Sequence, residues 1–247
     1  MTLDIAKSLF SDCFPTDPRE ADIILDFANR FGNILLKEQD RRIANMICSC
    51  DITAGDFSAS YLFACCTKQE FRSLGIFKEQ LSTFSDKPIF LIPESDSLHA
   101  FYERLGFSPI KHLTVTTDGF DDFSDVNPDK DELFAAYIES IAYPKKDFNL
   151  FSATLDAFYH YGGRVLVKNG VFITVIGNEI REVFTDSFDK IIAILKKSSV
   201  GNKKLLLPYH LKDRLIQNGI EFSENTLAMA RNLPSQMNKI YINNLFN

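Results

Sequence analysis

The sequence predicts an α/β protein in which buried strands alternate with amphipathic helices. Two stretches, residues 61–84 and 88–107, show this pattern most clearly. In each, an apolar run suited to a strand is followed by a short turn and then by apolar residues at helical spacing. A third observation comes from the second half, where Asn169-Gly170 joins two apolar runs and gives the strongest hairpin signal in the chain.

Two helices and a strand pair are expected ahead of the first stretch. Apolar residues at helical spacing predict the helices, and Pro18 suits the first turn of the second one because its fixed φ matches a helix start. A tight turn at Gln39-Asp40 is expected to join the strands, although it lacks the Asn-Gly preferred in two-residue hairpins. The expected elements are helices over 3–14 and 18–31 and strands over 33–38 and 41–51.

The first stretch has the layout of a phosphate-binding turn. A strand over 61–66 leads through a polar run to Arg72-Ser73-Leu74-Gly75, and a helical pattern follows over 76–84. The first N–H groups of a helix have no partner inside it, and together with the positive end of the helix dipole they attract anions. Gly75 allows a ligand to approach closely because it has no Cβ. A plain structural turn is the alternative for this junction.

The second stretch predicts a strand, a turn and a helix over 96–105. Ser95 or Asp96 is expected to cap the helix, and Gly106 suits the left-handed residue that ends it. The apolar face of this helix is formed by Leu98, Phe101, Tyr102 and Leu105.

Together, the two stretches resemble the GCN5-related N-acetyltransferase (GNAT) superfamily. That family has an Arg/Gln-x-x-Gly-x-Gly/Ala loop after its fourth strand and a Phe-Tyr-x-x-x-Gly-Phe segment after its fifth. The corresponding segments here are Arg72-Ser73-Leu74-Gly75-Ile76-Phe77 and Phe101-Tyr102-Glu103-Arg104-Leu105-Gly106-Phe107. The first departs from the family pattern at Phe77, which replaces a small residue. The resemblance covers about the first 115 residues.

The resemblance implies the GNAT fold, an α+β arrangement around a mixed sheet, with acetyl-CoA as cosubstrate. In the family the fourth strand splays from the fifth, and the pantetheine arm of acetyl-CoA pairs with its backbone like an added strand. The matching residues are Cys65, Cys66 and Thr67; the alternative is that the two cysteines are simply core strand residues. The resemblance also implies cofactor contacts from Arg72, Ser73, Leu74, Gly75, Ile76, Phe77, Lys78 and Ser95.

Tyr102 is the catalytic residue that the resemblance implies. Transfer of an acetyl group from a thioester to an amine needs a proton for the departing thiolate, and a phenol held near the sulfur can supply it. The alternative is that Tyr102 is a packing residue beside Phe101. No general base is evident. Glu94 is a candidate by its location, but it is more simply described as an exposed turn residue. A chain of water molecules is the remaining option.

The second half predicts another domain. An acidic, turn-rich connector over 118–132 marks the boundary between a domain of residues 1–120, with the acetyl-CoA site, and one of residues 121–247. Its predicted order, two helices, a strand hairpin, a strand and a helix, repeats that of the first half, but neither motif occurs in it, so it is predicted to be a degenerate GNAT-like domain. Its terminus, Asn244 to Asn247, is a candidate to reach the active site, as in the enhanced-intracellular-survival branch of the superfamily. The expected elements are helices over 133–142, 150–161, 187–197 and 208–217, a hairpin over 164–168 and 171–176, and strands over 203–207, 227–231 and 239–245.

Composition argues against several other classes of protein. A net charge of −6 and a pI near 5.3 do not suit a nucleic-acid binder. No stretch approaches the roughly 20 apolar residues of a membrane span, and the start lacks the basic flank of a signal peptide, so a cytoplasmic location is expected. Five Cys without a CxxC and four scattered His predict reduced thiols and no metal site.

These observations predict a cytoplasmic, acetyl-CoA-dependent N-acetyltransferase that acts on a primary amine of a small molecule or peptide. The alternative is a non-catalytic module that keeps the GNAT fold and binds acyl-CoA or a partner. Nucleotide binding through the Gly75 loop is disfavoured, because the Lys-Ser/Thr of a P-loop and the three-Gly dinucleotide fingerprint are both missing. The acceptor amine and the oligomeric state are left open by the sequence.

Overall fold

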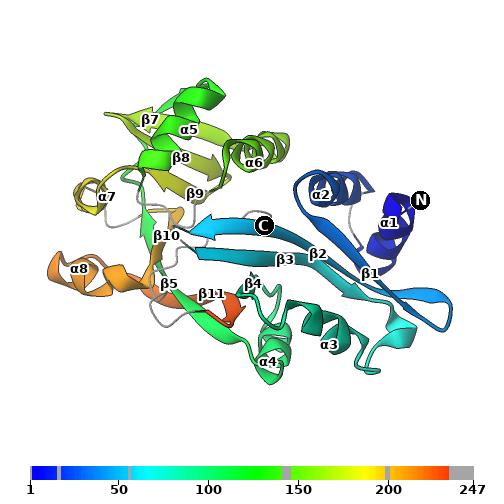
Figure 1. Ribbon diagram of the computed structural model, residues 1–247. Helices are drawn as coiled ribbons and strands as arrows, with labels where there is room; N and C mark the ends of the chain where they lie inside the picture. Colours follow the sequence, from blue (N-terminus) through cyan, green and yellow to red (C-terminus); the bar gives the residue numbers. More distant parts are fainter. Residues whose placement is uncertain (1, 16–17, 55–56, 141–145, 198–200, 234–247) are drawn as a thin grey trace. The chain divides into compact units, whose positions relative to one another are not determined.

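A computed structural model of the chain describes residues 2–15, 18–54, 57–140, 146–197 and 201–233 (Figure 1). It divides into two compact units. The first runs to Pro109 and is completed by a short segment that starts at Ala228, and the described part of the second is Ile110–Leu227. The domain boundary between residues 120 and 121 stays a prediction. The expected strand over 239–245 and the terminus Asn244 to Asn247 lie outside the described residues.

The first unit is a mixed sheet with helices on both faces (Figure 1). Strands β1, β2 and β3 are antiparallel neighbours, β4 is parallel to β3, and the end of β11 is antiparallel to β4. The elements, in chain order, are α1 (Thr2–Cys13), α2 (Pro18–Phe31), β1 (Asn33–Gln39), β2 (Arg42–Ala54), β3 (Phe57–Thr67), η1 (Gln69–Phe71), α3 (Ile76–Leu81), η2 (Ser82–Phe84), β4 (Ile89–Leu91), α4 (Asp96–Arg104) and the start of β5 (Ser108–Thr117).

The helices and strands predicted before residue 107 are confirmed, with a correction at the first hairpin. The two turn residues are Asp40 and Arg41, one position later than predicted, and both have positive φ (51° and 61°). Two successive left-handed residues give the turn the twist that matches the flanking strands. Asp tolerates that conformation because its short side chain can hydrogen-bond locally.

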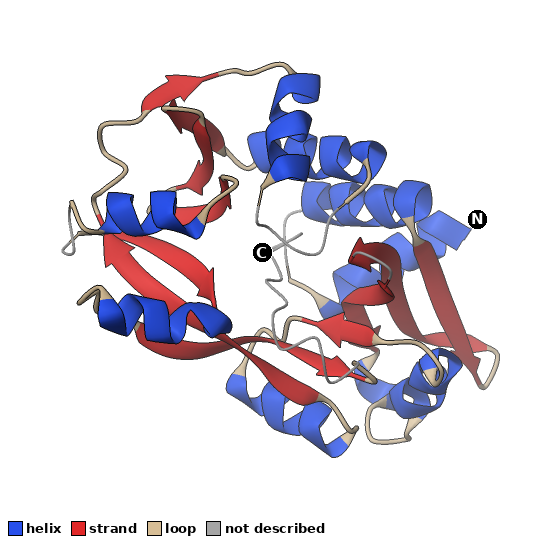
Figure 2. Ribbon diagram, turned by 60° about the vertical axis from the view of Figure 1, so that its left-hand side comes forward, coloured by secondary structure: helices blue, strands red, loops and turns tan. Residues whose placement is uncertain are grey.

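The second unit is a sheet with the strand order β5-β10-β9-β8-β7-β6. Helices α5 and α6 cover one face through a cluster that includes Leu133, Tyr137 and Phe184. The other face is covered by α7 and α8 through a cluster that includes Val183 and Leu195 (Figure 2). Its remaining elements are β6 (Ser124–Val126), α5 (Lys130–Glu139), α6 (Phe148–His160), β7 (Arg164–Lys168), β8 (Val171–Ile176), β9 (Glu179–Phe184), α7 (Phe188–Leu195), β10 (Lys203–Pro208), η3 (Tyr209–Leu211), α8 (Lys212–Gln217) and β11 (Ser223–Arg231).

Three strands of this unit were missed by the sequence patterns. β6 lies inside the predicted connector, where it pairs with β7, and β5 was not anticipated at all. β9 carries charges at Glu179, Arg181 and Glu182, so it lacks the apolar alternation that marks a strand. Glu182 is nevertheless buried, because Lys146 forms an ion pair with it.

The same order of elements occurs twice in the chain. Two helices, three antiparallel strands, a helix, a strand, a helix and a final strand run from α1 to β5 and again from α5 to β11. The final strand of each repeat, however, pairs in the other unit: β5 with β10, and the end of β11 with β4. Each unit therefore needs a strand from the other repeat to complete its sheet.

Replacing Glu182 by Ala is expected to lower the free energy of unfolding by about 3–5 kcal/mol, because it leaves a buried ammonium without its counterion. The Lys146 Nζ lies 3.3 Å from Glu182 Oε1 and 5.9 Å from the ring centre of Tyr137, and its side chain is 6% exposed. Urea denaturation gives the measurement. The matched control is Asp156→Ala, which breaks an exposed pair with Lys130 and should cost less than about 1 kcal/mol. Equal losses for both variants would contradict this prediction.

Within the described part of the chain, no helix combines the length and the apolarity that crossing a membrane requires.

Candidate functional site

The candidate site begins where β3 parts from β4. The two strands pair in parallel from Ser60 opposite Ile89 to Leu62 opposite Leu91, and β4 then ends. β3 continues to Thr67, so β2 is the only strand beside residues 64–67 in the part of the chain that the structure describes. A backbone edge that opens in this way can accept hydrogen bonds from an extended ligand. The splayed strand implied by the resemblance is present.

A β-bulge lies at the point of separation. Cys48 pairs with Phe63 and Met46 with Cys66, so Ala64 and Cys65 together face one residue of β2. Ala64 has a positive φ of 45°, which is unusual for a residue with a Cβ. Bulges are common beside functional sites, where they redirect a side chain.

The bulge reverses which face each following residue occupies. A regular strand would place Cys65 on the same face as Phe63, which packs against Phe27 of α2. With the extra residue, Cys65 instead joins the cluster beneath α3 and α4 that contains Tyr102. Cys66 consequently faces α1, where its thiol lies 3.8 Å from the carbonyl oxygen of Leu9. Of the two cysteines, only Cys65 has its side chain on the site.

The loop between β3 and α3 is held in an unusual backbone conformation. Ser73 and Gly75 both have positive φ (67° and 76°), and the Arg72 Nε donates a 3.2 Å hydrogen bond to the carbonyl oxygen of Thr67. A Cβ added to Gly75 would meet nothing within 4 Å, so the space beside it is open. Leu74 is 62% exposed. The loop therefore presents backbone, one cation and one apolar side chain to solvent.

The first turn of α3 divides between core and surface. Ile76 is buried in a small cluster with Ala44 and Phe71, which leaves only its backbone for a ligand. Lys78 is exposed. Phe77 is partly buried, and its ring centre lies 5.8 Å from that of Phe101 and 6.0 Å from that of Tyr102. The large residue at the family's small position therefore connects the loop to the predicted catalytic tyrosine.

Tyr102 lies among aromatic rings and is 7% exposed. Phe77, Phe101 and Phe107 meet it edge-on, with ring-centre distances of 5.2–6.0 Å. Burial raises the pKa of the Tyr102 phenol well above its usual range, and the nearby Cys65 thiol adds to the shift. Burial likewise raises the pKa of Cys65 to about 12. Both groups are therefore protonated at neutral pH, and the Tyr102 hydroxyl is a hydrogen-bond donor.

Ser95 is the N-cap residue of α4, as predicted, but its side chain makes no capping hydrogen bond. Its backbone carbonyl accepts hydrogen bonds from the N–H groups of Leu98 and His99, while its hydroxyl lies 3.0 Å from that of Ser97. The side chain is exposed, so it remains accessible to a ligand. Glu94 is exposed as well, which agrees with its description as an exposed turn residue.

Two features of the site were missed by the sequence analysis. Arg231, on the end of β11, donates hydrogen bonds of 3.3 and 3.5 Å to the carbonyl oxygens of Leu81 and Leu105, the last turns of α3 and α4. A guanidinium at these two helix ends is favoured by the helix dipoles. The second is a buried pair of amides, Asn45 and Gln80, beneath the loop. For Asn45, the available signal was a polar residue inside the apolar run from Ile43 to Cys48.

No family model matches the chain, and no curated protein sequence matches it either. Solved structures do match. A GCN5-related N-acetyltransferase of Anabaena variabilis superimposes with a TM-score of 0.62 at 12% identity, over 93% of this chain and 70% of that one. Eis1 of Mycobacterium abscessus gives a TM-score of 0.62 at 11% identity over 93% and 71% of the two chains. A GCN5-related N-acetyltransferase of Kribbella flavida gives 0.60 at 11% identity over 93% and 68%.

The fold is that of the GCN5-related N-acetyltransferases. The expected GNAT fold, an α+β arrangement on a mixed sheet, is confirmed over nearly the whole chain. β3 and β4 correspond to the family's fourth and fifth strands, the splayed pair, and the two motifs lie at α3 and α4.

Proposed function

We propose that the first unit binds acetyl-CoA and transfers its acetyl group to a primary amine of a small molecule or peptide. The observation that carries this proposal is the separation of β3 from β4 at the bulge, with Tyr102 and Cys65 in one cluster on the same face. An open strand edge beside a protonated phenol suits a thioester substrate, because the edge can hold an amide-containing arm while the phenol meets the sulfur.

The backbone of residues 65–67 is proposed to bind the pantetheine arm, and the loop from Arg72 to Lys78 the diphosphate. The open space beside Gly75 fits a bulky anion, and Arg72 and Lys78 are exposed cations next to it. Ser73 and Leu74 contribute backbone and exposed side chains, Ile76 only its backbone, and Phe77 the ring that packs on Tyr102. Ser95 offers a hydroxyl at the start of α4.

Tyr102 is proposed to stabilise the sulfur that leaves when the amine attacks the thioester carbonyl. The carbon–nitrogen bond forms, the carbon–sulfur bond breaks, and the amine loses a proton to water. Because burial raises the pKa of Tyr102, complete proton transfer to a thiolate, whose own pKa is near 8.5 in water, is unfavourable. The phenol therefore acts mainly by donating a hydrogen bond as charge develops on the sulfur.

The second unit is proposed to lack a cofactor site, although it keeps the splayed strand. β9 has a bulge at Arg181, and its parallel pairing with β10 stops at Ile180. However, the connection from β9 to α7 is too short to form a diphosphate-binding loop like the one between β3 and α3. The Ser187 hydroxyl also already accepts a hydrogen bond from the Asp189 N–H at the start of α7. The carboxylates of Asp186 and Asp189 beside this helix start also disfavour a phosphate.

Calorimetric titration of the purified chain with acetyl-CoA tests the proposal. We expect micromolar binding with one ligand per chain, competition by CoA, and no comparable binding of ATP, which has no pantetheine arm. A screen of primary amines, followed by detection of the released CoA thiol, then identifies the acceptor. Absence of acetyl-CoA binding by the folded chain would refute this function. We propose that the reaction takes place in the cytoplasm.

A further inference from the structure

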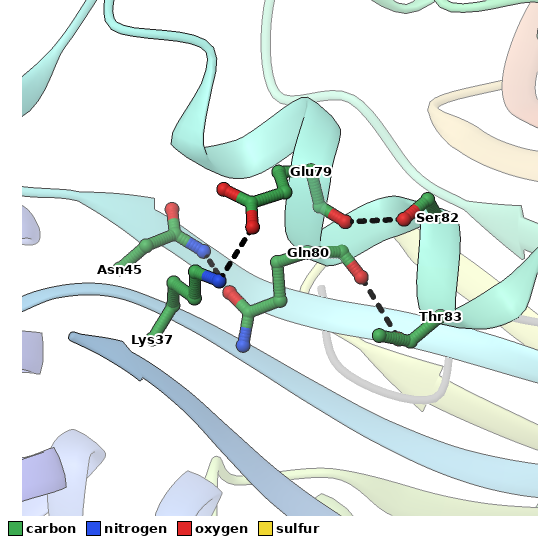
Figure 3. Close-up of polar contacts among 6 residues, drawn as sticks. All are labelled: Lys37, Asn45, Glu79, Gln80, Ser82 and Thr83. Atoms are coloured by element: carbon green, nitrogen blue, oxygen red, sulfur yellow. Dashed lines mark hydrogen bonds and ion pairs between the residues drawn. The ribbon is translucent and has the colours of Figure 1, made fainter. Parts of the chain in front are cut away.

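A buried chain of hydrogen bonds links three strands to α3, the helix that follows the candidate cofactor loop. The Thr67 hydroxyl donates to the Asn45 side-chain oxygen, the Asn45 amide nitrogen donates to the Gln80 oxygen, and the Gln80 nitrogen donates to the carbonyl oxygen of Leu35 at 2.8 Å. These groups belong to β3, β2, α3 and β1 in turn. Figure 3 shows Asn45 reaching up from β2 to meet Gln80 on α3.

The Asn45 amide contacts both Thr67 and Gln80 in either of its two orientations. The reversed amide donates to the Thr67 hydroxyl and to the carbonyl oxygen of Cys66 at 2.7 Å and accepts from the Met46 N–H at 3.2 Å, while its oxygen lies against the Gln80 amide. The chain of contacts from Thr67 to Gln80 is therefore continuous. It is also enclosed, because Asn45 is fully buried and Gln80 is 6% exposed. A buried amide that lost its partner would incur the full cost of desolvation, so the arrangement is strongly specified.

Two members of the chain of bonds lie on either side of the loop in the sequence. Thr67 is the last residue of the splayed strand, directly before η1, and Gln80 lies in the short helix that begins after Gly75. Two further hydrogen bonds hold the chain next to Thr67. The Lys68 N–H donates to the Ala44 carbonyl oxygen at 2.9 Å, and the Arg72 Nε donates to the carbonyl oxygen of Thr67. The strand edge and α3, the helix that follows the loop, are thus linked through Asn45.

We propose, on the basis of the acyl-CoA site proposed above, that Asn45 and Gln80 are positioning residues for that site. They hold the strand edge that takes the pantetheine arm and the loop that takes the diphosphate at the spacing of one ligand. Binding of a linked ligand benefits from such preorganisation, because the second half then binds at a high effective concentration. Neither half alone depends on the spacing.

The exposed ion pair on the same helix provides a contrast. The Lys37 Nζ lies 2.7 Å from Glu79 Oε1 on the residue before Gln80, and both side chains reach solvent (Figure 3). An exposed pair of this kind contributes little to rigidity, because water competes for both charges. Lys37→Met therefore removes a contact between the sheet and α3 without touching the buried amides, and serves as the matched control.

The experiment compares acetyl-CoA with its two halves, S-acetylpantetheine and 3′-phosphoadenosine 5′-diphosphate, in calorimetric titrations. Gln80→Met keeps the length of the side chain and its helix propensity but removes the hydrogen bonds, and Thr67→Val removes only the hydroxyl. For both variants we expect the Kd of acetyl-CoA to rise about tenfold, while the Kd of each half stays within about twofold. Lys37→Met should change none of the three.

Three outcomes separate this inference from the proposed function. If the wild-type chain binds acetyl-CoA and folded variants bind it equally well, the positioning role is wrong and the function stands. If a variant loses affinity for one half as strongly as for acetyl-CoA, the residue acts on that half directly and the positioning role is again wrong. If the wild-type chain binds no acetyl-CoA, the function itself fails. Thermal melts verify folding, and Thr67→Val remains informative should Gln80→Met not fold.

Discussion

Gly75→Glu is expected to abolish measurable acetyl-CoA binding, with a rise in Kd of more than about a hundredfold. Any Cβ at this position enters the open space beside the loop, and a carboxylate adds repulsion between like charges where the diphosphate is proposed to lie. The left-handed conformation, φ 76°, costs a side chain roughly 1–2 kcal/mol, so the chain should still fold. Calorimetry with acetyl-CoA, together with a thermal melt, gives the result.

The matched control is Gly219→Glu in the second unit. Gly219 also has a positive φ (66°), and its added Cβ also meets nothing within 4 Å, so the variant carries the same backbone strain and the same charge. We expect a similar loss of stability and unchanged acetyl-CoA binding. If both variants lose binding to the same extent, the effect is global, and Gly75 does not mark the site.

Tyr102→Phe is expected to lower kcat about 10²–10⁴-fold while leaving the Kd of acetyl-CoA within about twofold. The ring and its contacts with Phe77, Phe101 and Phe107 are retained, so only the hydroxyl is lost. The raised pKa of Tyr102 also gives a pH prediction. Its proton stays bound throughout the range from neutral to moderately alkaline pH, so the phenol should contribute no alkaline fall in kcat below about pH 10.

Tyr61→Phe is the control for the loss of a buried phenol. Tyr61 lies on β3 of the same unit, is 3% exposed, and has its pKa raised chiefly by burial, but it packs on Phe63 and Phe90 rather than on Tyr102. We expect kcat to be unchanged in this variant. If Tyr102→Phe also leaves kcat unchanged, Tyr102 is a packing residue. An acetyl-CoA-binding chain with no turnover for any amine would favour the non-catalytic module.

The sequence predicted most elements correctly because their signals are local. Helical spacing, the Asn169-Gly170 turn and the glycine after α4 depend on residues close together in the chain. The missed strands show the limit of such signals. β9 has a charged residue, Glu182, at a buried position, and this is stable only because Lys146 reaches it from outside the strand. A pattern of hydropathy along one segment contains no information about that partner.

The motifs themselves predicted the fold, which is confirmed, and the place of the candidate site, since the loop around Gly75 and the segment around Tyr102 are short, continuous stretches. Only the tertiary structure decided which side chains meet there. The extra residue at Ala64 turns Cys65 toward Tyr102 and Cys66 away from it, because one inserted residue exchanges the two faces of a strand. Likewise, Arg231 reaches the last turns of α3 and α4, and Asn45 reaches Gln80, from distant segments, through a strand exchange and a buried hydrogen bond that depend on the folded chain.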